Sequence, residues 1–278
     1  MMPKEKGTTR AAHRFRRFAS RATLLAILAI VVPALWFSGN YAYQVIRTDK
    51  ESDVLASESA LVESFHLVAH TSDDVDQSYA FPLNKWGPDV PVYYHQSVPD
   101  WHRRLTARQF EILSKYTGIR FHEIKRFEPN VGISVFYAPL GTSAEEMSRR
   151  FGIDRDRVQL ATCYGIYEWG DEGTVAWSHV VFSQPEGERR TEACIVEETV
   201  QVMGLPADRA TYFPTVFTND RARPVILSLN DKILLRALYD PAIKSGMTPD
   251  QTRALIPGII RRLVAGVKAR GERALFLN

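Results

Sequence analysis

The chain has few cysteines and no internal repeat, and most of its length has no excess of Lys and Arg over Asp and Glu. Residues 1–21 hold seven of its 35 Lys and Arg residues but only one of its 32 Asp and Glu residues. The remainder therefore carries 28 basic and 31 acidic side chains, a net charge of −3. A region of mildly negative charge is poorly suited to a phosphate backbone, so we do not expect nucleic-acid binding.

The chain contains only two cysteines, Cys163 and Cys194. An even count outside the cytoplasm allows one disulfide. We predict that they are bridged, which would pin the start of a helix at Cys194 to the segment around Cys163. Two unpaired buried thiols are the alternative, since the sequence does not fix the Cα separation.

The N-terminus combines a basic segment, residues 1–21, with an uncharged apolar run over residues 22–37. Ser38 and Gly39 extend that run toward the length that crosses a bilayer. Basic residues before it predict a cytoplasmic N-terminus. We therefore expect a single-pass anchor over 22–39 in the cytoplasmic (inner) membrane, a linker over 40–62 and an extracytoplasmic domain over 63–278. A cleaved signal peptide and a buried core helix are the alternatives.

The rest of the chain reads as a mixed sheet followed mostly by helices, an α+β pattern. Apolar spacing predicts a helix over 101–116 that stops at Gly118. Further helices are expected over 144–151, 190–203 and 231–238, the last capped by Asn230, and a final one begins at Thr248. Strand-like runs, which are β-branched, aromatic or alternating, occupy residues 64–70, 90–95, 119–124, 131–138, 161–169 and 174–182.

The helix-forming run over 193–205 has the frame of the zinc-peptidase pattern H-E-x-x-H-x-x-G. Glu198 stands at the general-base position and Gly204 at the glycine, which would let the chain turn sharply. Glu197 and Gln201 replace the two imidazoles, and positions i and i+4 share a helix face. Asp208 follows closely enough to reach back.

Zinc prefers imidazole, thiolate and some carboxylate ligands, so two required ligands are missing here. We therefore predict no zinc site and no cofactor. Glu197, Gln201 and Asp208 offer oxygen atoms that suit a hard cation instead, which remains an alternative. His66 and His70, four residues apart on an expected strand, are a second candidate metal pair, although such a pair is more often structural.

Two further interpretations of Glu197 and Glu198 stay open. Acidic pairs on helices are usually solvated, but the surrounding run is apolar on most sides, which indicates a buried helix. Buried carboxylates need partners and concentrate at functional sites. An acid–base pair acting on a sugar is awkward, because adjacent helix positions diverge by about 100°.

A family resemblance rests on residues that extend well beyond the motif. The chain resembles the bacterial domain-of-unknown-function family twenty-nine twenty-seven over roughly residues 63–260. That family is similar to zincin-like peptidases, with E-E-x-x-Q in place of H-E-x-x-H. The resemblance implies a sheet with a motif helix below it and C-terminal helices. The matching residues are Lys85, Trp86, Tyr116, Thr117, Gly118, Asn130, Val131, Cys194, Glu197, Glu198, Gln201, Gly204, Leu205, Asp208, Pro214 to Asp220, Leu229, Asp231, Leu234, Leu235, Arg236, Leu238 to Pro241, Gly246 and Met247.

These observations favour a membrane-anchored envelope protein whose zincin-like domain no longer uses zinc. We expect it to bind an extended peptide or an envelope component along the sheet edge beside the motif helix. The rival hypothesis is a hydrolase that uses Glu198 as general base with another cation or none. A purely structural envelope protein is the third.

Overall fold

A computed structural model describes residues 9–71, 80–138, 145, 149, 163–170, 173–183, 188–209, 212–218 and 224–277. The chain divides into two compact units, Met1–Arg47 and Thr48–Asn278. The helix expected over 144–151 lies outside the described residues, except that 145 and 149 are helical.

The described part of the first unit is helix α1, Thr9–Glu51, whose residues from 48 onward belong to the second unit. It contains the apolar run, including Pro33, without interruption. Side chains are described from residue 29 onward, except at 37, so the first seven residues of the run lie outside that part. Among the described side chains, no helix presents a stretch long and apolar enough to cross a bilayer.

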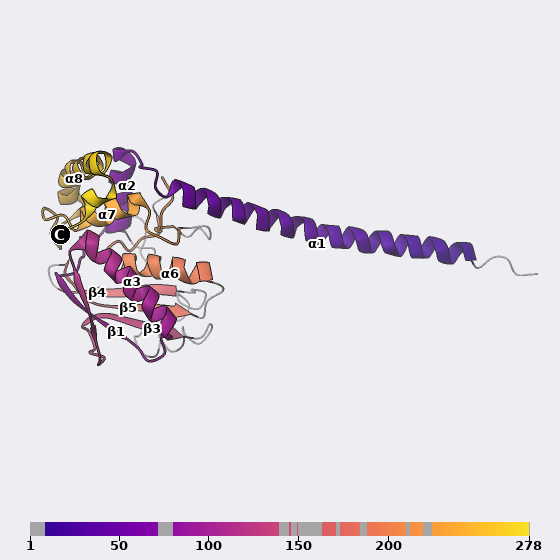
Figure 1. Ribbon diagram of the computed structural model, residues 1–278, viewed down its shortest axis with the longest axis horizontal. Helices are drawn as coiled ribbons and strands as arrows, with labels where there is room; N and C mark the ends of the chain where they lie inside the picture. The colour runs from indigo at the N-terminus through magenta and orange to yellow at the C-terminus, as the bar shows by residue number, and fades with distance from the viewer. Residues whose placement is uncertain are drawn as a thin grey trace, which may run out of the picture. The chain divides into compact units, whose positions relative to one another are not determined.

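The second unit contains a five-stranded mixed sheet in the order β2-β1-β3-β5-β4 (Figure 1). Its strands are β1 (Asp89–Tyr94), β2 (Arg120–Ile124), β3 (Gly132–Ala138), β4 (Cys163–Trp169) and β5 (Val175–Ser183). All neighbours run parallel except β4, which pairs antiparallel with β5. The sheet and its hairpin confirm the α+β prediction.

The helices of this unit are α2 (Glu58–His70), α3 (Asp100–Thr117), α6 (Glu188–Gln201), α7 (Leu229–Leu238), α8 (Pro249–Arg270) and the short η2 (Glu272–Leu275). In Figure 1, α3 and α6 lie between the sheet and a cluster formed by α2, α7 and α8. Most buried apolar side chains of the sheet and the helices form one continuous core, and Phe136 and Val181 form a small separate cluster. Fully buried members include Phe65, Leu113, Ile133, Val180, Met203 and Phe217.

The strand predicted over 64–70 is wrong, because these residues belong to α2. Leu61, Phe65, Val68 and Ala69 are all buried, and their spacing of three and four residues is that of a helix face. The helix begins earlier than the strand-like run, after the N-cap Ser57, whose hydroxyl accepts a hydrogen bond from the Ala60 amide. Within 64–70 alone, that spacing is too short to distinguish from an alternating strand.

Two of the other predicted helix ends are confirmed, and one is shifted. Gly118 ends α3 with φ 71°, and Thr248 caps α8 with a capping box. Helix α7, however, is capped by Ser228 rather than Asn230. Asn230 lies inside the helix, where its side chain accepts from the Ala56 amide and donates to the Val54 carbonyl. The amide therefore ties α7 to the segment before α2.

Candidate functional site

The motif residues lie on α6, which packs against strands β4 and β5 and against α3. From Ala193 to Val200 every residue of this helix is buried. Glu197 is 3% exposed and Glu198 is 4% exposed. The interpretation of Glu197 and Glu198 as a solvated acidic pair is therefore wrong, since both carboxylates lie inside the domain.

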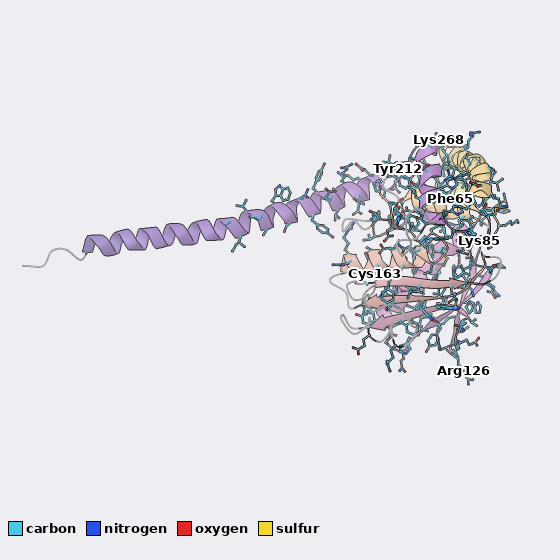
Figure 2. All side chains as sticks on the ribbon, turned by 180° about the vertical axis from the view of Figure 1, so that it is seen from behind. Phe65, Lys85, Arg126, Cys163, Tyr212 and Lys268 are labelled. Carbon is cyan, nitrogen blue, oxygen red and sulfur yellow. A yellow bond between two sulfur atoms is a disulfide. The ribbon has the colours of Figure 1, made fainter. Side chains whose placement is uncertain are left out.

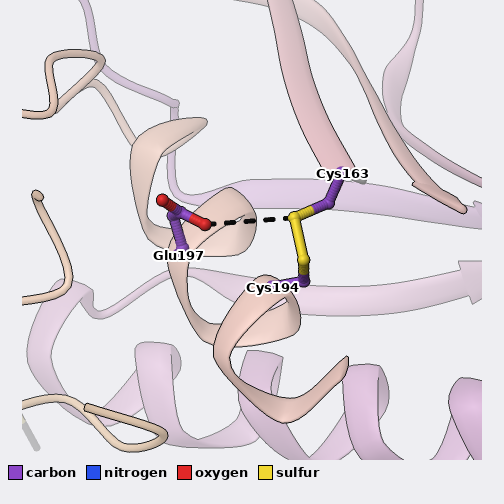
Figure 3. Close-up of side chains that lie close together, drawn as sticks. All are labelled: Cys163, Cys194 and Glu197. Atoms are coloured by element: carbon purple, nitrogen blue, oxygen red, sulfur yellow. Dashed lines mark hydrogen bonds between the residues drawn. A yellow bond between two sulfur atoms is a disulfide. The ribbon is translucent and has the colours of Figure 1, made fainter. Parts of the chain in front are cut away.

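Cys163 and Cys194 form the predicted disulfide, with Cα atoms 5.9 Å apart. It joins the first residue of β4, labelled Cys163 in Figure 2, to the middle of α6, as Figure 3 shows. In Figure 3 the dashed line joins Cys163 Sγ to Glu197 Oε2, 3.9 Å apart. A disulfide sulfur carries no proton, so this is a contact and not a donated hydrogen bond. The bridge thus places a carboxylate directly beside a sulfur–sulfur bond.

Glu198 faces the backbone of β4. A Cβ at Gly165 would lie 3.2 Å from Glu198 Oε2 and 2.8 Å from Val202 Cγ1. Real Cβ atoms are almost never found as close as this second distance. Glycine at 165 therefore allows α6 to approach the edge strand closely enough for the Glu198 side chain to lie against it.

Gln201 and Asp208 meet through a hydrogen bond. The Gln201 amide Nε2 donates to the Asp208 carboxylate Oδ1. Both side chains are half-buried. Asp208 thus reaches back to the motif helix, as its position in the sequence predicts. The hydrogen bond occupies an oxygen of Asp208 that would be a ligand if the site bound a hard cation.

Gly204 is required by the close approach of another segment. Its φ is +108°, and a Cβ would lie 1.9 Å from the Asn84 carbonyl oxygen. Next to that crossing, the Trp86 indole Nε1 donates to the Val202 carbonyl at 2.7 Å. The segment before β1 therefore passes directly under the end of α6, and only glycine gives it room.

The donor set at the motif does not fit a peptidase zinc ion. No imidazole is supplied by positions 197 or 201, and the amide of Gln201 is hydrogen-bonded to the carboxylate of Asp208. An amide is a poor zinc ligand, and a tetrahedral structural or catalytic site takes nitrogen, sulfur or carboxylate ligands. We therefore derive no step through zinc at this motif.

The His66 and His70 pair lies on one face of α2, with rings stacked at a centroid distance of 5.9 Å. His70 is held by the Phe81 carbonyl at Nδ1 and by the Thr252 hydroxyl at Nε2, both at 2.7 Å. Burial lowers the pKa of His66 to about 4, so it is neutral at physiological pH. Both ring nitrogens of His70 are committed, which makes the pair a packing element that joins α2 to α8.

Sequence reasoning did not identify three neighbours of the motif: Gly165, Asn84 and Trp86. Gly165 shows no motif spacing, and its role depends on which strand of the sheet α6 covers. Trp86, like its neighbour Lys85, belongs to the residues that carry the family resemblance. The hydrogen bond from its indole to the Val202 carbonyl links this pair of residues to the motif. Asn84 contributes through its backbone, for which the sequence holds no signal.

These features define an α+β domain in which a buried acidic helix is bridged to the antiparallel edge strand of a mixed sheet. The chain belongs to the family described as "Protein of unknown function (DUF2927)", which matches residues 58–258. The match confirms the family named by the sequence resemblance. No curated protein matches the chain.

Proposed function

We propose that this domain is zincin-like, has no catalytic zinc, and binds an extended peptide or a segment of an envelope protein along the outer edge of β4. The observation that carries this proposal is the place of β4. It is the last strand in the sheet order, it runs antiparallel to β5, and among the described strands only β5 pairs with it. The open edge of a strand offers backbone donors and acceptors to an added strand.

The surroundings of this edge support binding rather than hydrolysis. Helix α6 packs against β4, and the Cys163–Cys194 bridge fixes the two together. A rigid edge loses little conformational entropy when a peptide adds to it. Glu198 is only 4% exposed, so the candidate general base of the rival hydrolase has little access to a substrate.

A photo-crosslinking amino acid at position 168 tests this binding mode. Glu168 is exposed on β4, and Arg261, exposed on α8, is the matched control position. We expect irradiation of intact membranes to give adducts from position 168 that map to an extended segment of a partner, and none from position 261. Equal adducts from both positions, or none from 168, would overturn the edge-binding proposal.

Metal analysis of the purified, disulfide-bonded protein tests the absence of zinc catalysis. We expect zinc far below one equivalent. One equivalent of zinc, together with a hydrolytic activity that Glu198→Gln abolishes, would replace the binding proposal with the hydrolase.

We also propose that α1 anchors the chain in the inner membrane with the second unit outside the cytoplasm. The support is the basic segment 1–21 followed by the uncharged run 22–37, which lies within helix α1. Large apolar side chains of the run are exposed on α1, among them Ile30 at 71% and Leu35 at 67%. A surface of this kind suits lipid or another apolar partner.

Alkaline extraction of membranes checks the anchor. We expect the wild-type chain to stay with the membrane pellet and Ile30→Arg/Leu35→Arg to be released. Ile46→Arg is the matched control, since Ile46 is exposed on the same helix beyond the run. Release of the wild-type chain would refute the anchor.

A further inference from the structure

The disulfide and the adjacent carboxylate form a cluster with the composition of a metal site. Ligand atoms of Cys163, Cys194 and Glu197 all lie within 4.8 Å of one another (Figure 3). Cys194 precedes Glu197 by three residues, so the two share one face of α6. Cys163 comes from the facing strand β4. Two secondary-structure elements thus converge on one point.

The three side chains are chemically suited to zinc once the sulfur–sulfur bond is broken. Zinc binds thiolate sulfur at about 2.3 Å and carboxylate oxygen at about 2.0–2.2 Å. Ligands of one tetrahedral ion therefore lie about 3.5–3.8 Å apart. The three ligand atoms lie within 4.8 Å of one another, and Glu197 Oε2 is already 3.9 Å from Cys163 Sγ, so the main movement is that of the two sulfurs away from each other once their bond is broken. The Cα atoms of the two cysteines are 5.9 Å apart, and α6 packs on β4, so the thiols stay within reach of one ion.

We propose that Cys163, Cys194 and Glu197 form a redox-controlled zinc site, which the disulfide closes and a dithiol reductant opens. A thiolate of the reductant attacks one sulfur of the bridge, and its second thiol completes the exchange. The reductant becomes a disulfide, and two electrons and two protons pass to Cys163 and Cys194. Zinc then displaces both thiol protons, and Glu197 supplies the third ligand. A water molecule completes the tetrahedron.

The burial of Glu197 supports this assignment. Its side chain is 3% exposed, and its Oε2 lies 3.9 Å from the Cys163 sulfur. A carboxylate is costly to bury, and a divalent cation bound beside it stabilises its charged form. This proposal is independent of peptide binding at β4, because it concerns only the reduced protein. Zinc bound to the disulfide-bonded protein would instead bear on the proposed function.

Cobalt(II) titration of the purified full-length chain tests the site. The protein is reduced with a phosphine under argon, and Co²⁺ serves as the spectroscopic probe for zinc. We expect thiolate-to-cobalt charge-transfer bands that saturate at one equivalent, that Zn²⁺ removes, and that are absent before reduction. The proposal fails if the reduced chain shows no such bands, or if it loses its near-UV circular dichroism before metal is added.

Variants separate the three-ligand site from a simple dithiol. Glu197→Gln is expected to weaken cobalt binding about 100-fold while the charge-transfer bands persist, because even changes outside the ligand shell cost about 10–100-fold. Glu192→Gln, on the same helix and half-buried, is the control and should bind as wild type. Cys163→Ser should bind at least as weakly as Glu197→Gln and show a weaker charge-transfer band. Unchanged affinity in Glu197→Gln would overturn the assignment.

Discussion

Two regions of the domain bury carboxylates, and they do so in different ways. Asp231 on α7 is fully buried and accepts hydrogen bonds from the Thr215 hydroxyl and the Val216 and Ser228 amides. It is the third helical residue of α7 and forms a capping box with Ser228. Its burial is thus explained by the start of a helix and the loop over it.

Glu197 and Glu198 on α6 have a different environment. Glu197 Oε2 lies beside a disulfide sulfur, and the side chain of Glu198 lies against the edge strand at Gly165. Neither is in the first turn of α6, where a carboxylate could accept hydrogen bonds from the N–H groups that have no acceptor within the helix. Helix capping therefore accounts for Asp231 but not for this pair. The two regions therefore differ in where the charge is buried: Asp231 lies at the start of its helix, whereas Glu197 and Glu198 lie in the interior of α6.

The largest expected effect that sharpens this comparison is Gly204→Ala, at the end of α6. Its φ of +108° and the 1.9 Å approach of the Asn84 oxygen leave no room for a Cβ. We expect a loss of about 4 kcal/mol in the free energy of unfolding, or failure to fold. Chemical denaturation measures it.

Gly258→Ala is the matched control in the other region. Gly258 lies within α8, and a Cβ there would meet nothing within 4 Å. Alanine favours the helix, so we expect a gain of about 0.5–1 kcal/mol. Equal losses in the two variants would show that the crossing at Asn84 does not constrain α6.

Removal of the disulfide is the next largest effect. The bridge closes a loop across a sequence separation of 31 residues, for which loop entropy predicts about 3–4 kcal/mol. We expect Cys163→Ser/Cys194→Ser to lose that amount in the presence of a chelator, as measured by denaturant unfolding. A loss below about 1 kcal/mol would mean that packing alone holds α6 to β4.

Much of the fold could be predicted because the patterns are local. The amphipathic spacing of α3 and the alternation of the strands both depend on nearby residues. The pairing of Cys163 with Cys194 was also predictable, because two cysteines allow one bridge. The misread α2 shows the limit: seven residues of Ser64–His70 fit both periods, and only the buried Leu61 beyond them decides for the helix.

The site was less predictable, because its geometry depends on contacts between distant segments. The sequence places Glu197, Glu198 and Gln201 on one helix and Asp208 just beyond it. It does not say which strand α6 covers, so neither the role of Gly165 nor the contact between Glu197 and the disulfide follows from spacing. The burial of the two carboxylates is set by that packing.

The buried Asp231 on α7 makes the free energy of unfolding depend on pH. Burial raises its pKa from 3.8 to about 6, against hydrogen bonds that lower it. The folded state therefore holds an extra proton between these values, so the free energy of unfolding falls as the pH rises from about 4 to about 6. A difference of about two pKa units corresponds to about 3 kcal/mol.

Asp231→Asn removes this titration, and we expect the corresponding slope to disappear when unfolding is measured from pH 4 to pH 7. A slope that persists in the variant would assign the pH dependence to groups other than Asp231.

The smallest expected effect lies at the exposed start of α6. Arg189 donates two hydrogen bonds to Asp49, from Nη1 at 3.2 Å and Nη2 at 2.9 Å. Both side chains are partly exposed, at 31% and 46%, so solvent screens the pair. A double-mutant cycle of Arg189→Ala and Asp49→Ala should give a coupling of about 0.5 kcal/mol that weakens in high salt. A coupling above about 2 kcal/mol would mean that this pair helps to position α6, and the rigidity of the motif helix would then depend on its start as well as on its bridge to β4.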